Sequence, residues 1–266
     1  MPTYRRLLAP LAAGLVLAGL TAAPASAAHS WAGYHWARTA NPFTLKLGDN
    51  VSDSWDAYLR EASTDWNNSL VLQTTVEAGT AGTPKRCRAT SGRVEVCNST
   101  YGNNGWLGLA QVWTSSGHII QGVAKMNDTY FNSPPYSQPE WRRLVMCQEV
   151  GHTFGLGHQD ENQSNPNLGS CMDYTKDPAG TAATTGPLDN QHPNQHDYDQ
   201  LATIYVHTDA TTTVGASAPS PSAAGAGNSQ AEWGRAVRYA SDGRPILFER
   251  DLGNDQRVFT FVVWAG

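Results

Sequence analysis

The stretch CQEVGHTFGLGH, residues 147–158, constrains the fold more than any other part of the sequence. Within it, Glu149 precedes His152 by three residues, and Gly155 lies midway between His152 and His158. On a helix, the residue four places before His152 lies on the same face, so both side chains can reach one metal ion. Gly155 permits a sharp turn with positive φ, which returns His158 to that ion. The pattern therefore predicts a helix that ends at a metal site.

The same motif carries a family resemblance. QEVGHTFGLGH resembles the metzincin zinc-protease signature H-E-x-x-H-x-x-G-x-x-H, with Gln148 in place of the first histidine. Downstream, SCMDY (170–174) resembles the Met-turn, in which Met172 would form an apolar floor beneath the metal. WDAYLREASTDWN (55–67) and LGLAQVW (107–113) are similar to the first helix and the substrate-binding edge strand of matrixin-like domains. The resemblance spans roughly residues 29–207.

The resemblance implies a zinc-dependent endopeptidase that acts on peptide or protein substrates. Zinc lowers the pKa of its bound water toward about 7. Glu149 would take the proton of that water and pass it to the leaving amine, while the edge strand aligns an extended peptide. Tyr174 matches the S-x-M-x-Y pattern of the astacin and serralysin branches. It would be an extra ligand or a donor to the oxyanion, although a packed core tyrosine fits equally well.

Gln148 is the main departure from the signature, and three readings are open. Its side-chain oxygen can bind zinc, more weakly than imidazole does. Alternatively, the metal is lost and the chain is an inactive, metzincin-like secreted binding protein. A third reading borrows a ligand from elsewhere. We favour Gln148, His152 and His158 as ligands, because Glu149 would have no purpose in a decayed site. The candidates for a borrowed ligand are Asp160, His192, His196 and Tyr174; the histidines expected at the surface or in packing are His29, His35, His118 and His207.

Two carboxylates, Asp160 and Glu161, directly follow the motif. Calcium binding is one reading of this pair. A solvated acidic pair is the other, and it is the one we favour.

The N-terminus predicts export. Residues 1–27 hold Arg5 and Arg6, the apolar run LLAPLAAGLVLAGL and small residues near Ala27, which together are typical of a secretory signal peptide. The run is shorter than the roughly 20 residues of a membrane-spanning helix. We therefore expect a secreted, extracellular protein with no membrane segment in its mature form. A formal net charge of −5 argues against nucleic acid as a partner, and a monomer is expected.

Four cysteines in an exported chain indicate two disulfides, for which three pairings are possible. We favour Cys87–Cys97, which closes a local loop, and this leaves Cys147–Cys171. The second bridge would join the site helix to the Met-turn. By closing a loop of about 24 residues it would add roughly 3 kcal/mol of stability.

Periodicity predicts an α+β domain with a mixed twisted sheet over residues 28–207. Ser137 and Glu140 have the spacing of a capping box at the start of the site helix. Residues 208–230 are rich in Ala, Ser, Thr, Gly and Pro and predict a flexible linker, and residues 231–266 predict a small C-terminal β segment with one hairpin. The expected helices are 52–69, 137–152 and 196–207, and the expected strands before the site helix are 43–50, 70–79, 92–98, 106–113 and 117–127.

Overall fold

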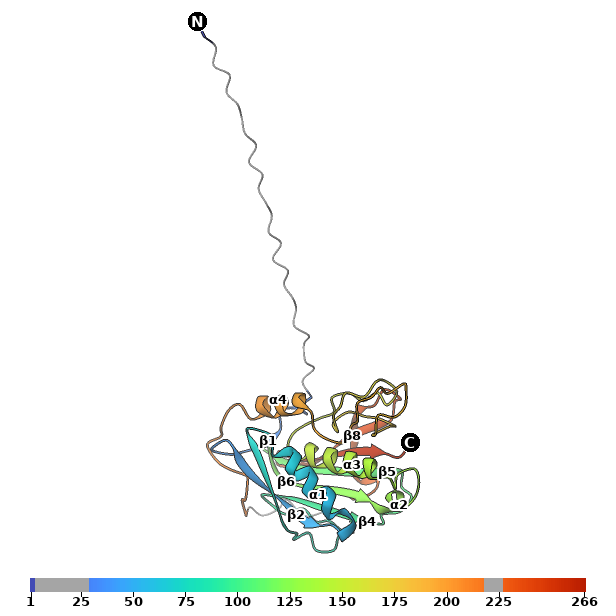
Figure 1. Ribbon diagram of the computed structural model, residues 1–266. Helices are drawn as coiled ribbons and strands as arrows, with labels where there is room; N and C mark the ends of the chain where they lie inside the picture. Colours follow the sequence, from blue (N-terminus) through green and yellow to red (C-terminus); the bar gives the residue numbers. More distant parts are fainter. Residues whose placement is uncertain (3–28, 218–226) are drawn as a thin grey trace.

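The computed structural model describes residues 1–2, 29–217 and 227–266 (Figure 1). The predicted signal peptide therefore lies, apart from its first two residues, outside the described residues. Within the described residues, no helix combines the length and apolar character that crossing a bilayer requires.

A mixed sheet runs through the described part of the chain in the order β3-β2-β4-β6-β5-β9-β8-β7, and β1 also pairs with β6. The pairings among β1, β2, β3, β4 and β6 are parallel, whereas β5 pairs antiparallel with both β6 and β9. The strands are β1 His35–Trp36, β2 Phe43–Asn50, β3 Leu72–Ala78, β4 Val94–Ser99, β5 Trp106–Ser115, β6 His118–Asn127, β7 Arg235–Tyr239, β8 Pro245–Gly253 and β9 Gln256–Trp264. The fold is α+β, as predicted.

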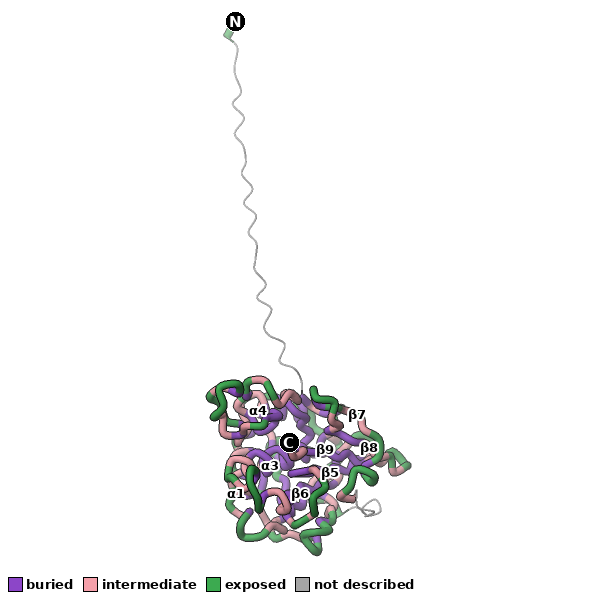
Figure 2. The backbone as a smooth tube through the Cα atoms, turned by 90° about the vertical axis from the view of Figure 1, so that its right-hand side faces the viewer, coloured by how far each residue is buried: buried purple, intermediate pink, exposed green. Residues whose placement is uncertain are grey.

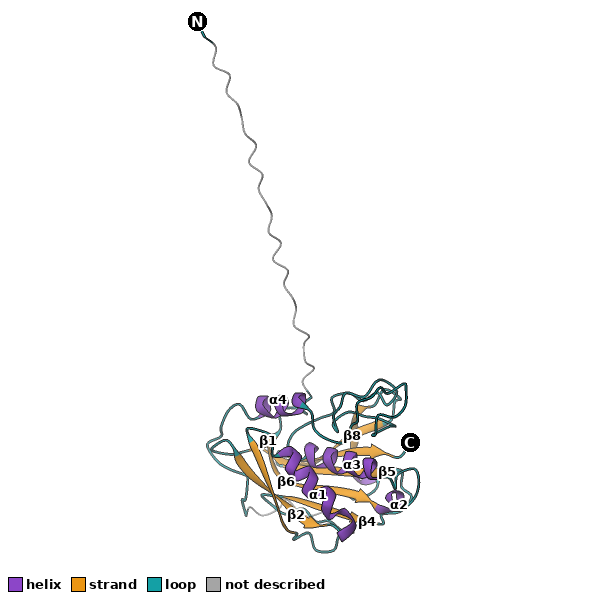
Figure 3. Ribbon diagram, viewed as in Figure 1, coloured by secondary structure: helices purple, strands orange, loops and turns teal. Residues whose placement is uncertain are grey.

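Two long helices pack side by side on one face of this sheet (Figure 3). In α1, Asp53–Trp66, the residues Trp55, Leu59, Ala62 and Trp66 are buried at helical spacing. This apolar stripe holds α1 against α3 and the sheet. The other helices are α2 Asp128–Phe131, α3 Pro139–His152, α4 Gln195–Ile204 and a short 3-10 turn, Gln230–Glu232.

The start of α3 differs from the prediction. Gln138 is the N-cap and makes no side-chain capping bond, and Pro139 is the first helical residue. The predicted capping box of Ser137 and Glu140 was therefore wrong. Proline is well suited to the first position of a helix, so the helix begins one residue later than that box requires.

The core lies between the sheet and the pair α1 and α3. It includes Trp36, Trp55, Trp66 and Phe154, all fully buried. Figure 2 shows buried chain concentrated around α3, β5, β6 and β9. The buried end of α3 thus lies in the middle of the molecule rather than on its surface.

The C-terminal segment continues the main sheet rather than standing apart. Strands β8 and β9 form the predicted hairpin, and β9 then pairs with nearly the whole length of β5, with Ala110 opposite Phe261. Residues 231–266, predicted to form a small C-terminal β segment, thus share one sheet with the strands of residues 28–207. A hairpin of two strands is only marginally stable by itself, which favours such an addition.

Residues 208–217, expected to belong to a flexible linker, lie against the domain. The amide of Thr213 donates to the carbonyl of Ala37 at 2.9 Å, and that of Gly215 donates to Gly92 at 2.8 Å. Asp209 forms an ion pair with Arg38. Main-chain hydrogen bonds and one charged anchor thus fix a segment whose composition offers little apolar surface. Residues 218–226 of that linker lie outside the described residues.

Candidate metal centre and substrate cleft

The motif residues meet at the end of α3. Gln148, Glu149 and His152 lie in its last turns and are 1%, 0% and 0% exposed, and His158 is 4% exposed after the following turn. We call these four residues the α3 site. Gly155 has φ +101°, as predicted, and a Cβ there would lie 2.5 Å from the carbonyl oxygen of Tyr34. The turn that follows α3 therefore requires glycine.

The two imidazoles of the α3 site lie next to each other. Their ring centroids lie 4.5 Å apart at 89°. His152 Nδ1 is 2.8 Å from the carbonyl oxygen of Leu156, to which it donates, so Nε2 carries the free lone pair. The Nε2 atoms of His152 and His158 are both buried and have no hydrogen-bond partner among the described residues. An ion between them would satisfy both nitrogens, which are otherwise costly to bury.

Burial also keeps these rings neutral. It lowers the pKa of His152 to about 3, and it lowers the pKa of His158 well below its ordinary value. A neutral imidazole is the form that binds metal. The two rings are thus ready to accept a cation near neutral pH without first losing a proton.

Gln148 and Glu149 add unsatisfied polar atoms to the same place. Gln148 Nε2 and both carboxylate oxygens of Glu149 are buried without a hydrogen-bond partner in the described chain. Burial raises the pKa of Glu149 well above its ordinary value. Such a concentration of unpartnered buried polar atoms is unusual in a folded protein and calls for a bound ion or water. The residues present therefore fit a zinc ion with an attached water.

Met172 lies beneath this end of α3, where the resemblance places it. It is fully buried. A Cβ added at Gly151 would come 2.7 Å from Met172 Sδ, so the absence of a side chain at Gly151 admits the methionine against the helix. The disulfide Cys147–Cys171 joins α3 to the residue before Met172, and Cys87–Cys97 closes the local loop. Both predicted pairings are confirmed.

Tyr174 is buried beside the histidines. Its ring centroid is 4.5 Å from that of His158. Its hydroxyl donates to the carbonyl oxygen of Val262 in β9 at 2.5 Å. In this arrangement the hydroxyl is occupied by the C-terminal strand, so the role predicted for it requires that strand to move.

The residues considered as borrowed ligands have other partners. His192 Nδ1 lies 2.8 Å from an Asp65 carboxylate oxygen, and His196 stacks on His29 with centroids 4.8 Å apart. Asp160 accepts from the side chain of Asn165 at 2.8 Å. His192 and Asp160 are thus held by hydrogen bonds, whereas His196 Nδ1 is buried without a hydrogen-bond partner among the described residues.

The two carboxylates considered for calcium are engaged with protein groups. Asp160 accepts from the main-chain amide of Asn162 as well as from Asn165. Glu161 forms an ion pair with Arg238 of β7 at 3.2 Å. These contacts do not support the calcium reading.

Strand β5 runs beside Glu149 but does not form a free edge. A Cβ at Gly108 would lie 2.5 Å from Glu149 Oε1, which places this part of β5 against the carboxylate. The prediction that residues 107–113 form a substrate-binding edge was wrong for this structure, because β9 pairs along β5. The Phe261 ring of β9 stacks on His152, with centroids 4.1 Å apart and planes at 12°. The sequence could not reveal this, since a strand pattern does not specify its partner.

Sequence analysis also missed a second convergence of histidines. His29 is a buried packing residue, as expected. His35, His118 and His207 instead gather around Asp209, which carried no prediction. No local spacing signals this group, because its members come from three distant parts of the chain.

Two solved structures resemble parts of this chain at 11% sequence identity. No protein-family model matches the chain, and no curated protein sequence matches it. Among solved structures, it superposes on high choriolytic enzyme 1, a hatching-enzyme zinc protease from the medaka fish Oryzias latipes, with TM-score 0.36 and 11% identity over 65% of this chain and 94% of the other. For myroilysin the TM-score is 0.37 and the identity 11%, over 65% and 97%. Likenesses of this degree carry no functional conclusion.

Proposed function

We propose that this protein is a secreted zinc-dependent endopeptidase whose cleft is closed by its own C-terminal strand. One observation supports this above the others. Two neutral imidazoles with free Nε2 atoms and one glutamate with two unpartnered oxygens meet at the buried end of α3. Burying several unpartnered polar groups together is unfavourable, and a bound ion with a catalytic role would account for it.

In this proposal, His152 Nε2, His158 Nε2 and the side-chain oxygen of Gln148 hold the ion. Bound zinc supplies an acidified water and polarises the scissile carbonyl. Glu149 accepts the proton of the attacking water on a carboxylate oxygen and delivers it to the leaving amine nitrogen. The carboxylate must be ionised to act as a base. Burial opposes ionisation, so the cation beside Glu149 is also needed to lower its pKa.

The substrate would lie where β9 lies now. An extended peptide can add to a sheet edge through main-chain hydrogen bonds. Strand β9 makes such bonds to β5, while Phe261 covers the His152 ring and Val262 occupies the Tyr174 hydroxyl. In this proposal, hydrolysis requires β9 to leave β5, and the arrangement with β9 paired to β5 is a latent form.

The deciding experiment cleaves the backbone ahead of the C-terminal strands and, separately, replaces the general base Glu149. A recognition sequence for a specific protease is inserted after the exposed Ser217, and peptide hydrolysis is measured before and after cutting. We expect hydrolysis to rise on cutting, and Glu149→Gln to reduce it by about 10²–10⁴-fold. Glu140→Gln, at the first turn of the same helix, should change neither activity nor zinc content. Retained folding and zinc in Glu149→Gln would show that only the proton transfer was lost.

The alternative is a secreted binding protein without turnover. The burial of the α3 site favours it, because Glu149 has no solvent access in this structure. It predicts that the cut protein hydrolyses no member of a diverse peptide mixture and that the α3 site holds no stoichiometric zinc. Either result in a folded protein would remove the enzymatic reading.

A further inference from the structure

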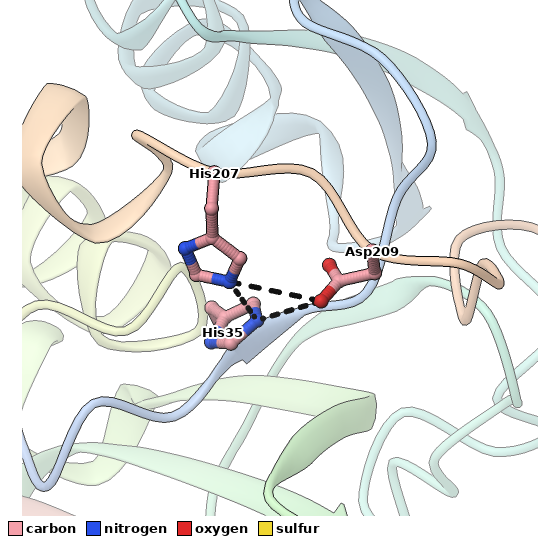
Figure 4. A group of neighbouring side chains, drawn as sticks. All are labelled: His35, His207 and Asp209. Carbon is pink, nitrogen blue, oxygen red and sulfur yellow. Dashed lines mark hydrogen bonds and ion pairs between the residues drawn. The ribbon is translucent and has the colours of Figure 1, made fainter.

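A second group of potential ligands lies where β1, β6 and the chain after α4 meet (Figure 4). His35 belongs to β1, and His207 and Asp209 follow α4. We call these three residues the His–His–Asp cluster. None of them belongs to the α3 site. His118 stands beside the cluster, because the parallel register of β1 and β6 pairs it with His35.

The distances within the cluster match a coordination shell. His35 Nε2 lies 3.2 Å from His207 Nε2 and 3.5 Å from Asp209 Oδ1, and His207 Nε2 lies 3.6 Å from the same oxygen. Tetrahedral zinc with bonds of about 2.0–2.1 Å has ligand atoms about 3.3–3.4 Å apart. Two nitrogens and one oxygen thus occupy three corners of such a tetrahedron.

The orientation of His35 suits a metal ion at this point. Its Nδ1 lies 2.9 Å from the carbonyl oxygen of Gly33 and donates to it. In the neutral ring, Nε2 then directs a lone pair at both Asp209 Oδ1 and His207 Nε2. Lone pairs facing one another at these distances repel, whereas a metal ion between them would bind all three atoms. A carbonyl that fixes the outer nitrogen is also the usual support of a metal-binding histidine.

Asp209 is held so that one oxygen remains for the ion. Its Oδ2 accepts from the main-chain amide of Arg38 at 3.1 Å and from Arg38 Nη1 at 2.9 Å. Oδ1 faces the two imidazoles, and His118 Nε2 lies 3.3 Å from it. Burial would raise the pKa of Asp209, but the hydrogen bond from the main-chain amide of Arg38 is the largest of the contacts that lower it, to about 2. The group is therefore an anionic ligand at neutral pH.

We propose that His35 Nε2, His207 Nε2 and Asp209 Oδ1 bind one Zn²⁺, with water in the fourth position. His118 is a positioning residue that donates to Asp209 Oδ1. Two imidazoles and a carboxylate suit zinc better than the oxygen-preferring cations. The His207 side chain is 49% exposed, so the site opens to solvent. The ion would connect the chain after α4 to β1, at the start of the segment of residues 208–217 that lies against the domain.

Metal counting tests the proposal. The full chain is dialysed against Zn²⁺ at pH 7.5, and bound metal is measured for the wild type, His207→Ala and Thr208→Ala. We expect His207→Ala to lose one zinc per chain, and Thr208→Ala, an exposed neighbour between the two ligands, to lose none. Zinc retained at the wild-type level in His207→Ala would overturn the proposal.

The same measurement separates this site from the α3 site. His158→Ala should lose a different zinc, so each single variant keeps the metal that the other loses. If the α3 site binds no zinc, the wild type holds one ion, His158→Ala keeps it and His207→Ala holds none. The two proposals can therefore fail independently.

Two further readouts distinguish bound metal from a merely protonated cluster. Zinc at about 100 times its dissociation constant should raise the unfolding midpoint of the wild type by about 5–10 °C more than that of His207→Ala. His118→Ala should weaken zinc binding by about 10–100-fold without abolishing it. A stability difference between wild type and His207→Ala that follows pH but ignores zinc would assign the site to a proton instead, against the proposal.

Discussion

The α3 site and the His–His–Asp cluster differ in how exposed their imidazole rings are and in which partners their Nε2 atoms have. The α3 site is covered by β9, and the Nε2 atoms of its two histidines have no partner among the described residues. The cluster lies near the surface, with His207 half exposed and every Nε2 atom within 3.6 Å of Asp209. Burial therefore leaves the first site with unpartnered nitrogens that a metal ion would bind. In the second, carboxylate and solvent can stabilise the empty state as well.

The largest effect is expected from uncovering the sealed site. Phe261→Ala removes the ring that stacks on His152 and should cost about 3–5 kcal/mol of stability. It should also raise peptide hydrolysis by the uncut chain, because the imidazole becomes accessible. Phe248→Ala is the matched control, since Phe248 is equally buried but packs on Trp233. Denaturant unfolding and a peptide assay check both variants; equal activity in the two would show that Phe261 does not guard the site.

Breaking the turn after α3 comes next. Gly155→Ala forces a side chain into positive φ and to within 2.5 Å of the Tyr34 carbonyl oxygen. The conformational strain alone costs about 1–2 kcal/mol, and the contact adds to it. Gly186→Ala also has positive φ, but nothing lies within 4 Å of its Cβ, so it should show the strain alone. Gly155→Ala should also lower zinc content. Identical stabilities of the two variants would mean that the contact is relieved by a small shift.

Strengthening the unusual ligand should have a moderate effect. Gln148→His replaces an amide by an imidazole on the same helix face and should tighten zinc binding roughly tenfold or more. Competition with a chelator of known affinity measures this change. The His–His–Asp cluster serves as an internal control, since its metal should be unaffected. An unchanged affinity at the α3 site would remove Gln148 from the ligand set.

The smallest effect concerns His192, a candidate that belongs to neither site. A hydrogen bond with Asp65 raises the pKa of His192 above its ordinary value. A raised pKa in the folded state stabilises the protein below about pH 6.5, and this contribution is lost as pH rises through the folded value. Because the ring is half exposed, His192→Gln should cost only a few tenths of a kcal/mol, at acidic pH alone. Loss of zinc from this variant would revive the borrowed-ligand reading.

The two sites also differ in how far the sequence predicts them. His152, Gly155 and His158 lie within one helix and one turn, so local geometry determines their relation, and Met172 follows from a second short motif. The Cys147–Cys171 pairing was accessible for the same reason. His35 and Asp209 are separated by 174 residues, and only the completed fold brings them together. Periodicity is a local property, and it cannot report such a meeting.

Because periodicity is local, it also could not show that residues 107–113 of β5 are paired rather than a free edge. The strand character of residues 244–266 was readable, because apolar residues flank a clear turn. Its pairing with β5 was not, because many exposed edges could accept a hairpin of this composition. The capping-box error has a different origin. Ser137 and Glu140 had suitable spacing, but Pro139 set the first helical position, which a spacing rule does not weigh.

Strand β7 forms one edge of the sheet, and its features disfavour pairing with a strand of another chain. It has five residues, and its pairing with β8 shifts register after Ala236 and again after Arg238. Short, irregular and charged borders discourage intermolecular pairing. If the C-terminal strands depart, the border becomes β5, which is ten residues long and buried along almost its whole length while β9 covers it. A molecule with its C-terminal strands released would therefore expose an edge that can pair with any extended chain, including another copy of the protein. The time for which it stays unaggregated would depend on how quickly a peptide substrate occupies that edge.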